Sequence, residues 1–168
     1  PTDFVQSTSN SIAGTLALMG KITGYNNTHV NNGIAFEAAV LDALLLFEEG
    51  ETKRLLLGGV EEISQANYNV DSLRGMFKEE AIDSTQLLHS DSPGTVSGEG
   101  AALFVVDAEK SADSIAKIVD VAQICNAGKE AVVEKAKAFL KRNNKSLEDI
   151  DALFLGLNGD NRTDYYYT

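Results

Sequence analysis

The segment 28–50, THVNNGIAFEAAVLDALLLFEEG, places a short β-prone run directly before a long apolar helix. The N-terminus of a helix presents unpaired N–H groups and the positive end of the helix dipole, an arrangement that can activate a nucleophile. The residues at this point are Asn31, Asn32 and Gly33, and residues 30–34 contain no cysteine, serine or histidine. The segment therefore has the layout of a nucleophile site but lacks the nucleophile.

Three other residues carry reactive side chains, and each has a structural interpretation beside a catalytic one. His29 adjoins the helix start and is a candidate acid–base group, although a histidine at the end of a strand is more often a hydrogen-bonded structural residue. Cys125 lies in an apolar stretch, where a lone cysteine is usually a small core residue. His89 lies in a polar stretch and is expected to be solvated.

Glycine pairs and acidic clusters resemble ligand-binding motifs without having their spacing. The pair Gly58-Gly59 and the loop 94–100 lack the Gly-Lys-Ser and spaced-glycine fingerprints of phosphate binding, so close backbone packing explains them better. Tyrosines 165–167 fit a stacking platform and an exposed or edge segment equally well. Carboxylates at element ends usually diverge into water, which favours a solvated surface over a metal site for Glu48, Glu49, Glu51, Glu61 and Glu62. The sequence predicts no cofactor and no metal.

The elements that must position these residues alternate between apolar runs and helical patterns, which is typical of an α/β architecture. Helix 34–49 is apolar nearly all round and is expected to be buried, and with strands 28–30 and 53–58 it forms a predicted βαβ unit in a parallel sheet. The other expected elements are helices 4–21, 70–82 and 129–142, strands 101–109 and 152–157, a β-rich run 115–124, and a turn capped by Ser146 with Asp149.

Composition narrows the class of protein. With 43% hydrophobic and 23% charged residues, the chain has the composition of a globular protein. The most apolar run, 38–47, is broken by Asp42 and is too short for a membrane span. The net charge of −11 argues against nucleic acid, although a local basic patch would still permit an acidic carrier. A single cysteine favours a reducing compartment, so a cytoplasmic location is expected.

Three segments occur in the order and approximate spacing of one known family. They are RLLLGGVEE at 54–62, GTVSGEGAALFVVDAE at 94–109 and SLEDIDALFLGLNGD at 146–160. The chain resembles the β-ketoacyl-acyl carrier protein synthases in these segments, and the GEGAALFVV element is the most specific of them. This resemblance implies a thiolase-like fold with layered α-β-α order and mostly parallel sheets, incomplete in this chain. It also implies that residues 1–109 are part of an N-terminal synthase half and that residues 110–168 begin a C-terminal half.

Members of the family move an acyl group from a carrier to a cysteine at a buried helix N-terminus, and two histidines assist decarboxylation and attack. Counting back from Gly58-Gly59, the resemblance places the cysteine position on Gly33 or its neighbour Asn32, and the first histidine position on Asn158. Neither Gly33 nor Asn32 can accept an acyl group. Asn158 can donate a hydrogen bond to an oxyanion but cannot shuttle a proton. The second histidine position falls beyond residue 168.

Two functions follow from these matched positions. In the first, the protein is a non-condensing synthase-like subunit that acts as a structural or chain-length partner of an active synthase. In the second, it is an active, divergent 3-oxoacyl-acyl carrier protein synthase that uses His29 or residues outside the segment. Either function implies acyl carrier protein as a partner and a homodimer or a heterodimer with an active synthase.

Overall fold

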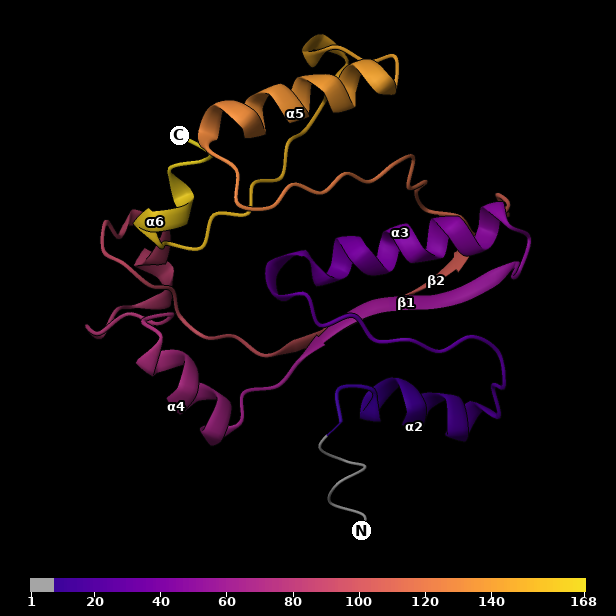
Figure 1. Cartoon of the computed structure of the whole chain (residues 1–168), viewed down its shortest axis with the longest axis horizontal. Coiled ribbons are helices and arrows are strands. Elements are labelled where there is room, and N and C mark those ends of the chain that lie inside the picture. The colour runs from indigo at the N-terminus through magenta and orange to yellow at the C-terminus, as the bar shows by residue number, and fades with distance from the viewer. Residues whose placement is uncertain (1–7) are drawn as a thin grey trace. The chain divides into compact units, whose positions relative to one another are not determined.

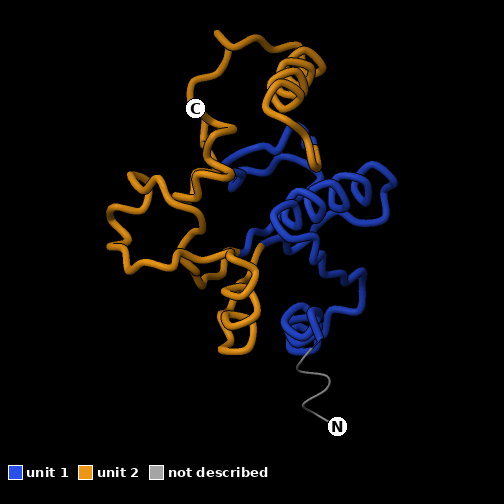
Figure 2. Tube along the Cα trace, turned by 60° about the vertical axis from the view of Figure 1, so that its left-hand side comes forward, with its two compact units in different colours: residues 1–58, 103–123 blue, residues 59–102, 124–168 orange. Residues whose placement is uncertain are grey.

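The computed structural model describes residues 8–168, and the chain divides into two compact units (Figure 2). The first unit comprises residues 1–58 and 103–123, and the second comprises residues 59–102 and 124–168. Each unit is therefore built from two separate stretches of chain. The predicted division at residue 109 into two synthase halves stays a prediction.

The structure is mixed α/β (Figure 1). Across residues 8–168, no helix combines the length and apolar character that a membrane crossing requires. The elements in chain order are α2 (Ser11–Gly20), η1 (Asn32–Ile34), α3 (Ala35–Glu48), β1 (Arg54–Glu61), α4 (Gln65–Leu73), η2 (Ser84–His89), β2 (Gly100–Asp107), α5 (Lys129–Arg142), η3 (Leu147–Asp149) and α6 (Asn161–Asp164).

Helix α3 carries the core of the first unit and lies along the β1–β2 pair (Figure 1). Its buried residues Val40 and Ala43 pack with Leu57 of β1, which confirms the predicted helix and strand. The expectation that helix 34–49 is buried inside a large molecule stays a prediction, since within this chain the helix buries one face. Leu41 and Leu45 are 42% and 47% exposed, because they lie on the helix face opposite to the strands.

Strands β1 and β2 form a two-stranded antiparallel sheet. The first residue of β1 meets the last residue of β2, since Arg54 Nε donates to Asp107 Oδ1 over 2.6 Å and the N–H of Ala108 donates to the carbonyl of Lys53 over 3.0 Å. The sequence predicts a parallel sheet for β1, and this pair differs from that prediction. After residues 62–99, β2 runs back beside β1 in the opposite direction. A parallel pair would require a crossover that brings the second strand in along the same direction as the first.

Three predicted strands are not formed within the described residues. The runs 28–30, 115–124 and 152–157 have no ladder partner, and their apolar side chains are largely exposed, with Phe154 at 95%. An apolar run becomes a strand only where a neighbouring strand accepts its N–H and C=O groups. The runs therefore lie outside the β1–β2 sheet.

The helices agree with the sequence predictions more closely than the strands do. Helix α5 has the predicted bounds, and Ser146 and Asp149 form the predicted capping box, in which the N–H of Ser146 donates to Asp149 Oδ2 over 2.8 Å. The helix predicted at 70–82 instead spans Gln65–Leu73, because Ser64 Oγ accepts from the N–H of Asn67 and caps an earlier start. The helix predicted at 4–21 is observed from Ser11, and its first residues lie outside the described part of the chain.

Candidate functional site

The start of α3 is a sharp turn at Asn32. The φ angle of Asn32 is 51°, in the left-handed region that asparagine tolerates better than most residues, and η1 leads from it directly into α3. Asn32 and Gly33 are exposed, and a Cβ atom built on Gly33 would meet nothing within 4 Å. The turn therefore presents residues 32–33 and the first N–H groups of the helix to solvent. Such groups can stabilise an anion, but neither side chain can form an acyl intermediate.

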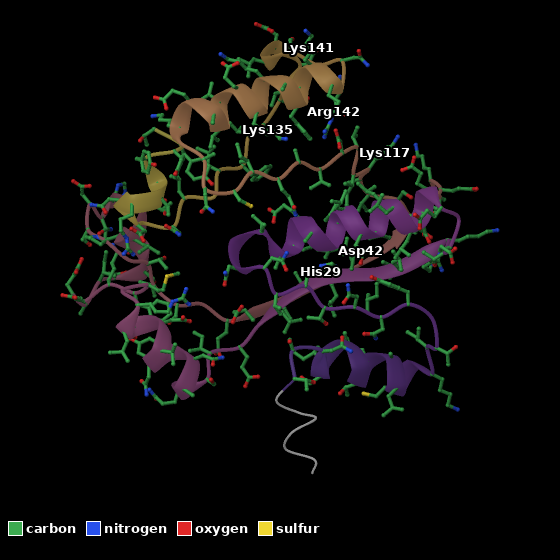
Figure 3. All side chains as sticks on the ribbon, in the orientation of Figure 1. His29, Asp42, Lys117, Lys135, Lys141 and Arg142 are labelled. Atoms are coloured by element: carbon green, nitrogen blue, oxygen red, sulfur yellow. The ribbon has the colours of Figure 1, made fainter. Side chains whose placement is uncertain are left out.

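His29 belongs to a hydrogen-bonded network on the side of α3 (Figure 3). Its Nε2 atom lies 3.1 Å from Asp42 Oδ2, and the Tyr25 hydroxyl donates to the same oxygen over 2.7 Å. Asn27 Nδ2 donates to the Tyr25 hydroxyl over 3.1 Å. The His29 and Asp42 side chains are 21% and 27% exposed. Asp42 thus fixes the segment 25–29 against the helix and orients the imidazole.

The electrostatics of this network keep the Asp42 carboxylate ionised at neutral pH. Burial acts to raise the pKa of Asp42, but hydrogen bonds from Tyr25, His29 and Asn27 together outweigh it, so the pKa lies below its ordinary value. The pKa of Tyr25 is raised, chiefly because its hydroxyl donates to that carboxylate. The network can therefore hold an acid–base group in place, as serine hydrolases do with a buried carboxylate.

Sequence reasoning identified His29 but missed Asp42 and Tyr25 as its partners. The available signal was the single carboxylate that interrupts the apolar run 38–47. A lone charge on an apolar helix face requires a partner, and the nearest histidine in sequence is His29.

Asn158 is held in the second unit by four hydrogen bonds. Its Oδ1 atom accepts from the N–H of Asp160 over 3.0 Å and from the Thr163 hydroxyl over 3.3 Å. Its N–H donates to Asp164 Oδ1, and its carbonyl accepts from the Thr95 hydroxyl over 2.6 Å. The side-chain NH₂ is the polar group of Asn158 that has no partner among the described residues. Asn158 is thus able to donate a hydrogen bond, as the sequence predicts.

The segment around Asn158 is fixed by three charged side chains. Asp160 is 6% exposed and accepts from Arg162, which also donates to the carbonyl of Gly75 over 2.7 Å. Lys78 Nζ donates to the carbonyl and hydroxyl of Ser92 and to the carbonyl of Gly159 over 2.9–3.1 Å. These bonds join residues 75–95 to residues 158–162 within the second unit.

Acid should weaken the second unit through Asp160. Its hydrogen bond from Arg162 lowers the pKa from 3.8 to about 2. Because the folded pKa is depressed, the stabilisation is complete above about pH 4 and is lost as the pH falls toward 2. Asp160→Asn should therefore lower the free energy of unfolding by about 1–2 kcal/mol at pH 7 and by much less near pH 2.5.

Urea denaturation at the two pH values measures this difference. Asp151→Asn is the matched control, since Asp151 is exposed in the same unit. An equal loss of stability at both pH values would show that the ionisation of Asp160 does not contribute.

The remaining candidate residues are dispersed. Cys125 is exposed, so its predicted role in the core was wrong, whereas His89 is solvated as predicted. A Cβ atom on Gly94 would lie 2.5 Å from the carbonyl carbon of Phe77, which confirms close packing there, while Gly59 has open space. The described residues contain no grouping of three or more His, Cys, Asp or Glu side chains that would suit a metal ion. The five carboxylates that were predicted to form a solvated surface are all exposed: Glu48, Glu49, Glu51, Glu61 and Glu62.

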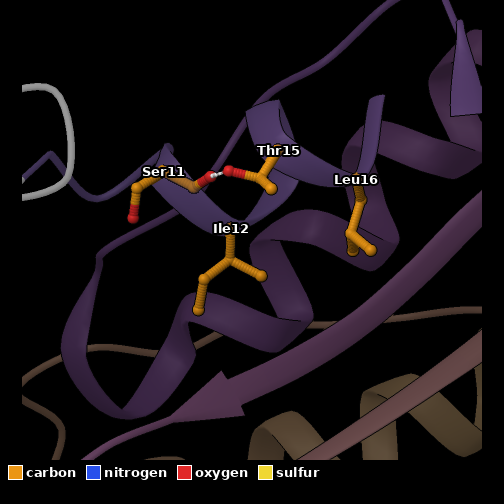
Figure 4. Close-up of a pocket in the computed structure, with 4 residues that line it drawn as sticks. All are labelled: Ser11, Ile12, Thr15 and Leu16. Atoms are coloured by element: carbon orange, nitrogen blue, oxygen red, sulfur yellow. Dashed lines mark hydrogen bonds between the residues drawn. The ribbon is translucent and has the colours of Figure 1, made fainter. Parts of the chain in front are cut away.

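A shallow pocket lies on α2 and is lined by Ser11, Ile12, Thr15 and Leu16 (Figure 4). The Thr15 hydroxyl donates to the carbonyl of Ser11 over 2.6 Å, one turn earlier in the helix. Such a bond satisfies the hydroxyl within the helix itself. The pocket therefore offers a mainly apolar surface in which the Thr15 hydroxyl is already hydrogen-bonded.

The matched positions fall in different units, with Asn32 and Gly33 in the first and Asn158 in the second. Comparisons of the chain with protein-family models, with curated proteins and with solved structures gave no match.

Proposed function

We propose that the chain is part of a β-ketoacyl synthase-like protein of fatty acid or polyketide biosynthesis that does not itself condense. One observation carries the proposal. At the start of α3, where the family has its cysteine, the residues are Asn32 and Gly33, and they are exposed at a helix N-terminus. An exposed helix start could support an acyl acceptor, but neither Asn32 nor Gly33 can serve as one.

The surroundings of this position support the proposal. Helix α3 packs its apolar face on β1, and the paired Gly58-Gly59 lies within that strand. The left-handed turn at Asn32 is a conformation that concentrates at functional sites. The finer architecture proposed is the thiolase-like, layered α-β-α fold with mostly parallel sheets, of which these residues form a part.

The proposed role is that of a structural or chain-length partner of an active synthase in the cytoplasm. The exposed apolar face of α3, with Leu41 and Leu45, supports pairing with further protein. A homodimer and a heterodimer with a cysteine-bearing synthase are both compatible with such a face. Acyl carrier protein is the proposed carrier of the acyl group.

One observation favours the alternative of an active, divergent enzyme. The imidazole of His29 is oriented by Asp42, and Asp42 is in turn bonded to Tyr25. A carboxylate-oriented imidazole is a common acid–base arrangement. In the alternative, the protein condenses acyl groups itself and uses His29 or residues outside the segment.

Incubation with acyl carrier protein that carries a radiolabelled acyl group distinguishes the two functions. We expect no covalent acyl adduct on the chain. We expect condensation with malonyl-acyl carrier protein only after a cysteine-bearing synthase is added. Intact-protein mass spectrometry measures the adduct, and product analysis measures condensation. A stoichiometric adduct, or condensation by the chain alone that His29→Gln abolishes, would establish the alternative.

A further inference from the structure

The chain contains two Asn-Gly pairs, Asn32-Gly33 and Asn158-Gly159. An asparagine that precedes glycine is chemically labile. The backbone nitrogen of the glycine can approach and attack the side-chain carbonyl carbon Cγ of the asparagine, because glycine has no side chain to hinder the approach. Since both pairs consist of the same two residues, the structure around each pair decides how fast it reacts.

The surroundings of Asn32-Gly33 leave this pair open to the reaction. Both residues are exposed, and the side-chain amide of Asn32 makes no hydrogen bond within residues 8–168. A Cβ atom built on Gly33 would meet nothing within 4 Å, so a ring can close there and water can reach it. The N–H of Gly33 is one of the first N–H groups of the helix that η1 and α3 form, and such groups have no acceptor within the helix. The helix therefore restrains neither the attacking nitrogen nor the amide under attack.

The surroundings of Asn158-Gly159 hold that pair in place. The N–H groups of Asn158 and Gly159 donate to the two carboxylate oxygens of Asp164 over 3.0 and 2.8 Å. The Oδ1 atom of Asn158 accepts from the N–H of Asp160 and from the Thr163 hydroxyl. Gly159 itself is buried. Attack by the Gly159 nitrogen therefore requires these hydrogen bonds to open first, and the fold protects the pair.

We propose that Asn32-Gly33 is a site of spontaneous deamidation in the folded protein. The Gly33 nitrogen bonds to Asn32 Cγ, the Cγ–Nδ2 bond breaks, and the side-chain nitrogen leaves as ammonia with the proton that Gly33 loses. Water then adds to one of the two carbonyl carbons of the resulting five-membered succinimide ring. Addition at Cγ gives aspartate, and addition at the main-chain carbonyl carbon gives isoaspartate, in which the chain continues through the side chain. Water is the only co-reactant.

Either product changes the chemistry at the start of α3. Each adds one carboxylate at the end of the helix where the dipole stabilises negative charge. Isoaspartate also inserts a methylene group into the main chain at the left-handed turn of Asn32. The first N–H groups of a helix can stabilise an anion, whereas a carboxylate beside them repels one. Deamidation therefore converts an anion-stabilising helix start into an anion-repelling one as the protein ages. This inference does not depend on the proposed function.

Incubation of the 168-residue chain at mildly basic pH, with samples taken over several weeks, tests the proposal. Trypsin releases the two Asn-Gly pairs in separate peptides, 22–53 and 146–162. Mass spectrometry measures the gain of about 1 Da that replacement of NH₂ by OH produces, and electron-transfer fragmentation separates aspartate from isoaspartate. We expect Asn32 to convert at least about tenfold faster than Asn158 in the folded chain. In concentrated guanidinium chloride, where the fold is lost, we expect the two rates to agree within about threefold.

Two variants separate the contributions of sequence and structure. Gly33→Ala adds a methyl group that hinders the attack, and it fits, because Gly33 has open space and a φ angle outside the left-handed region. We expect Gly33→Ala to slow the conversion of Asn32 by about tenfold and to leave Asn158 unchanged. Asp164→Ala removes both acceptors that hold Asn158-Gly159, so the conversion of Asn158 should accelerate by at least about fivefold while that of Asn32 stays the same.

Three outcomes would overturn the deamidation proposal: no conversion at Asn32 during the incubation, equal rates at Asn32 and Asn158 in the folded chain, or an unaltered Asn32 rate in Gly33→Ala. Circular dichroism of each variant verifies that its helices are intact. The comparison of the folded and denatured unaltered chain requires no variant, so it decides the proposal even where a substitution disturbs the fold.

Discussion

Gly33→Cys should convert the start of α3 into an acyl acceptor. A Cβ atom at this position meets nothing within 4 Å, so the side chain fits without moving its neighbours. A thiol at a helix N-terminus has a lowered pKa, because the dipole and the first N–H groups stabilise the thiolate. In a Cys125→Ser background, which removes the exposed native thiol, we expect labelled acyl carrier protein to transfer its acyl group to Cys introduced at residue 33.

The control for this experiment is Gly24→Cys in the same background. Gly24 also has open space around it, but it lies between α2 and η1 and not at a helix start. The rate of alkylation by iodoacetamide as a function of pH gives the thiol pKa of each variant. We expect the pKa at residue 33 to be lower by about one unit. Equal pKa values and equal acyl labelling would show that the start of α3 has no activating geometry.

Gly94→Ala should destabilise the second unit severely. The φ angle of Gly94 is 84°, and the added methyl group would lie 2.5 Å from the carbonyl carbon and 2.7 Å from the backbone nitrogen of the adjoining residues Phe77 and Lys78. Backbone atoms cannot move away as a flexible side chain can. The strain of a positive φ angle and the steric overlap of the methyl group with the backbone therefore both destabilise the fold. We expect a loss of about 3 kcal/mol or more in the free energy of unfolding, measured by urea denaturation.

Gly98→Ala is the matched control, because the same loop leaves open space around Gly98. A change within about 1 kcal/mol is expected there. The neighbouring Thr95 donates to the carbonyl of Asn158, so Gly94→Ala should also release the Asn158 segment. Faster amide hydrogen exchange at residues 158–160 in Gly94→Ala, and not in Gly98→Ala, would report that release. Equal stability of the two variants would contradict the close packing at Gly94.

Local signals were sufficient to predict several elements from the sequence. The apolar pattern of α3, the bounds of α5 and the Ser146–Asp149 capping box all depend on residues within a few positions of one another. The strands required more than local information. Leu55 and Leu57 are in β1 as predicted, but its antiparallel partner is set by a contact between Arg54 and Asp107, 53 residues apart.

The candidate site was predictable in part for the same reason. The resemblance indicated Asn32, Gly33 and Asn158, and the structure describes the backbone and hydrogen bonds at each. The resemblance did not indicate that Asp42 orients His29, because the hydrogen bond between them joins residues 13 positions apart across the turn. The apolar runs 115–124 and 152–157 failed as strand predictions, since hydrophobicity reports a tendency to be buried and not the presence of a pairing edge.

The two-stretch construction of each unit has a consequence for biosynthesis on the ribosome. The stretch up to residue 58 is made before residues 59–102, but the residues 103–123 that complete the first unit, with most of β2, are made only after them. At a translation rate of about 5–20 residues per second, the apolar face of β1 waits roughly 2–9 s for its partner. During that interval Leu55 and Leu57 form an unpaired edge that a chaperone would shield. The nascent chain should therefore bind ribosome-associated chaperones most strongly between the emergence of β1 and that of β2, as crosslinking of stalled nascent chains would measure.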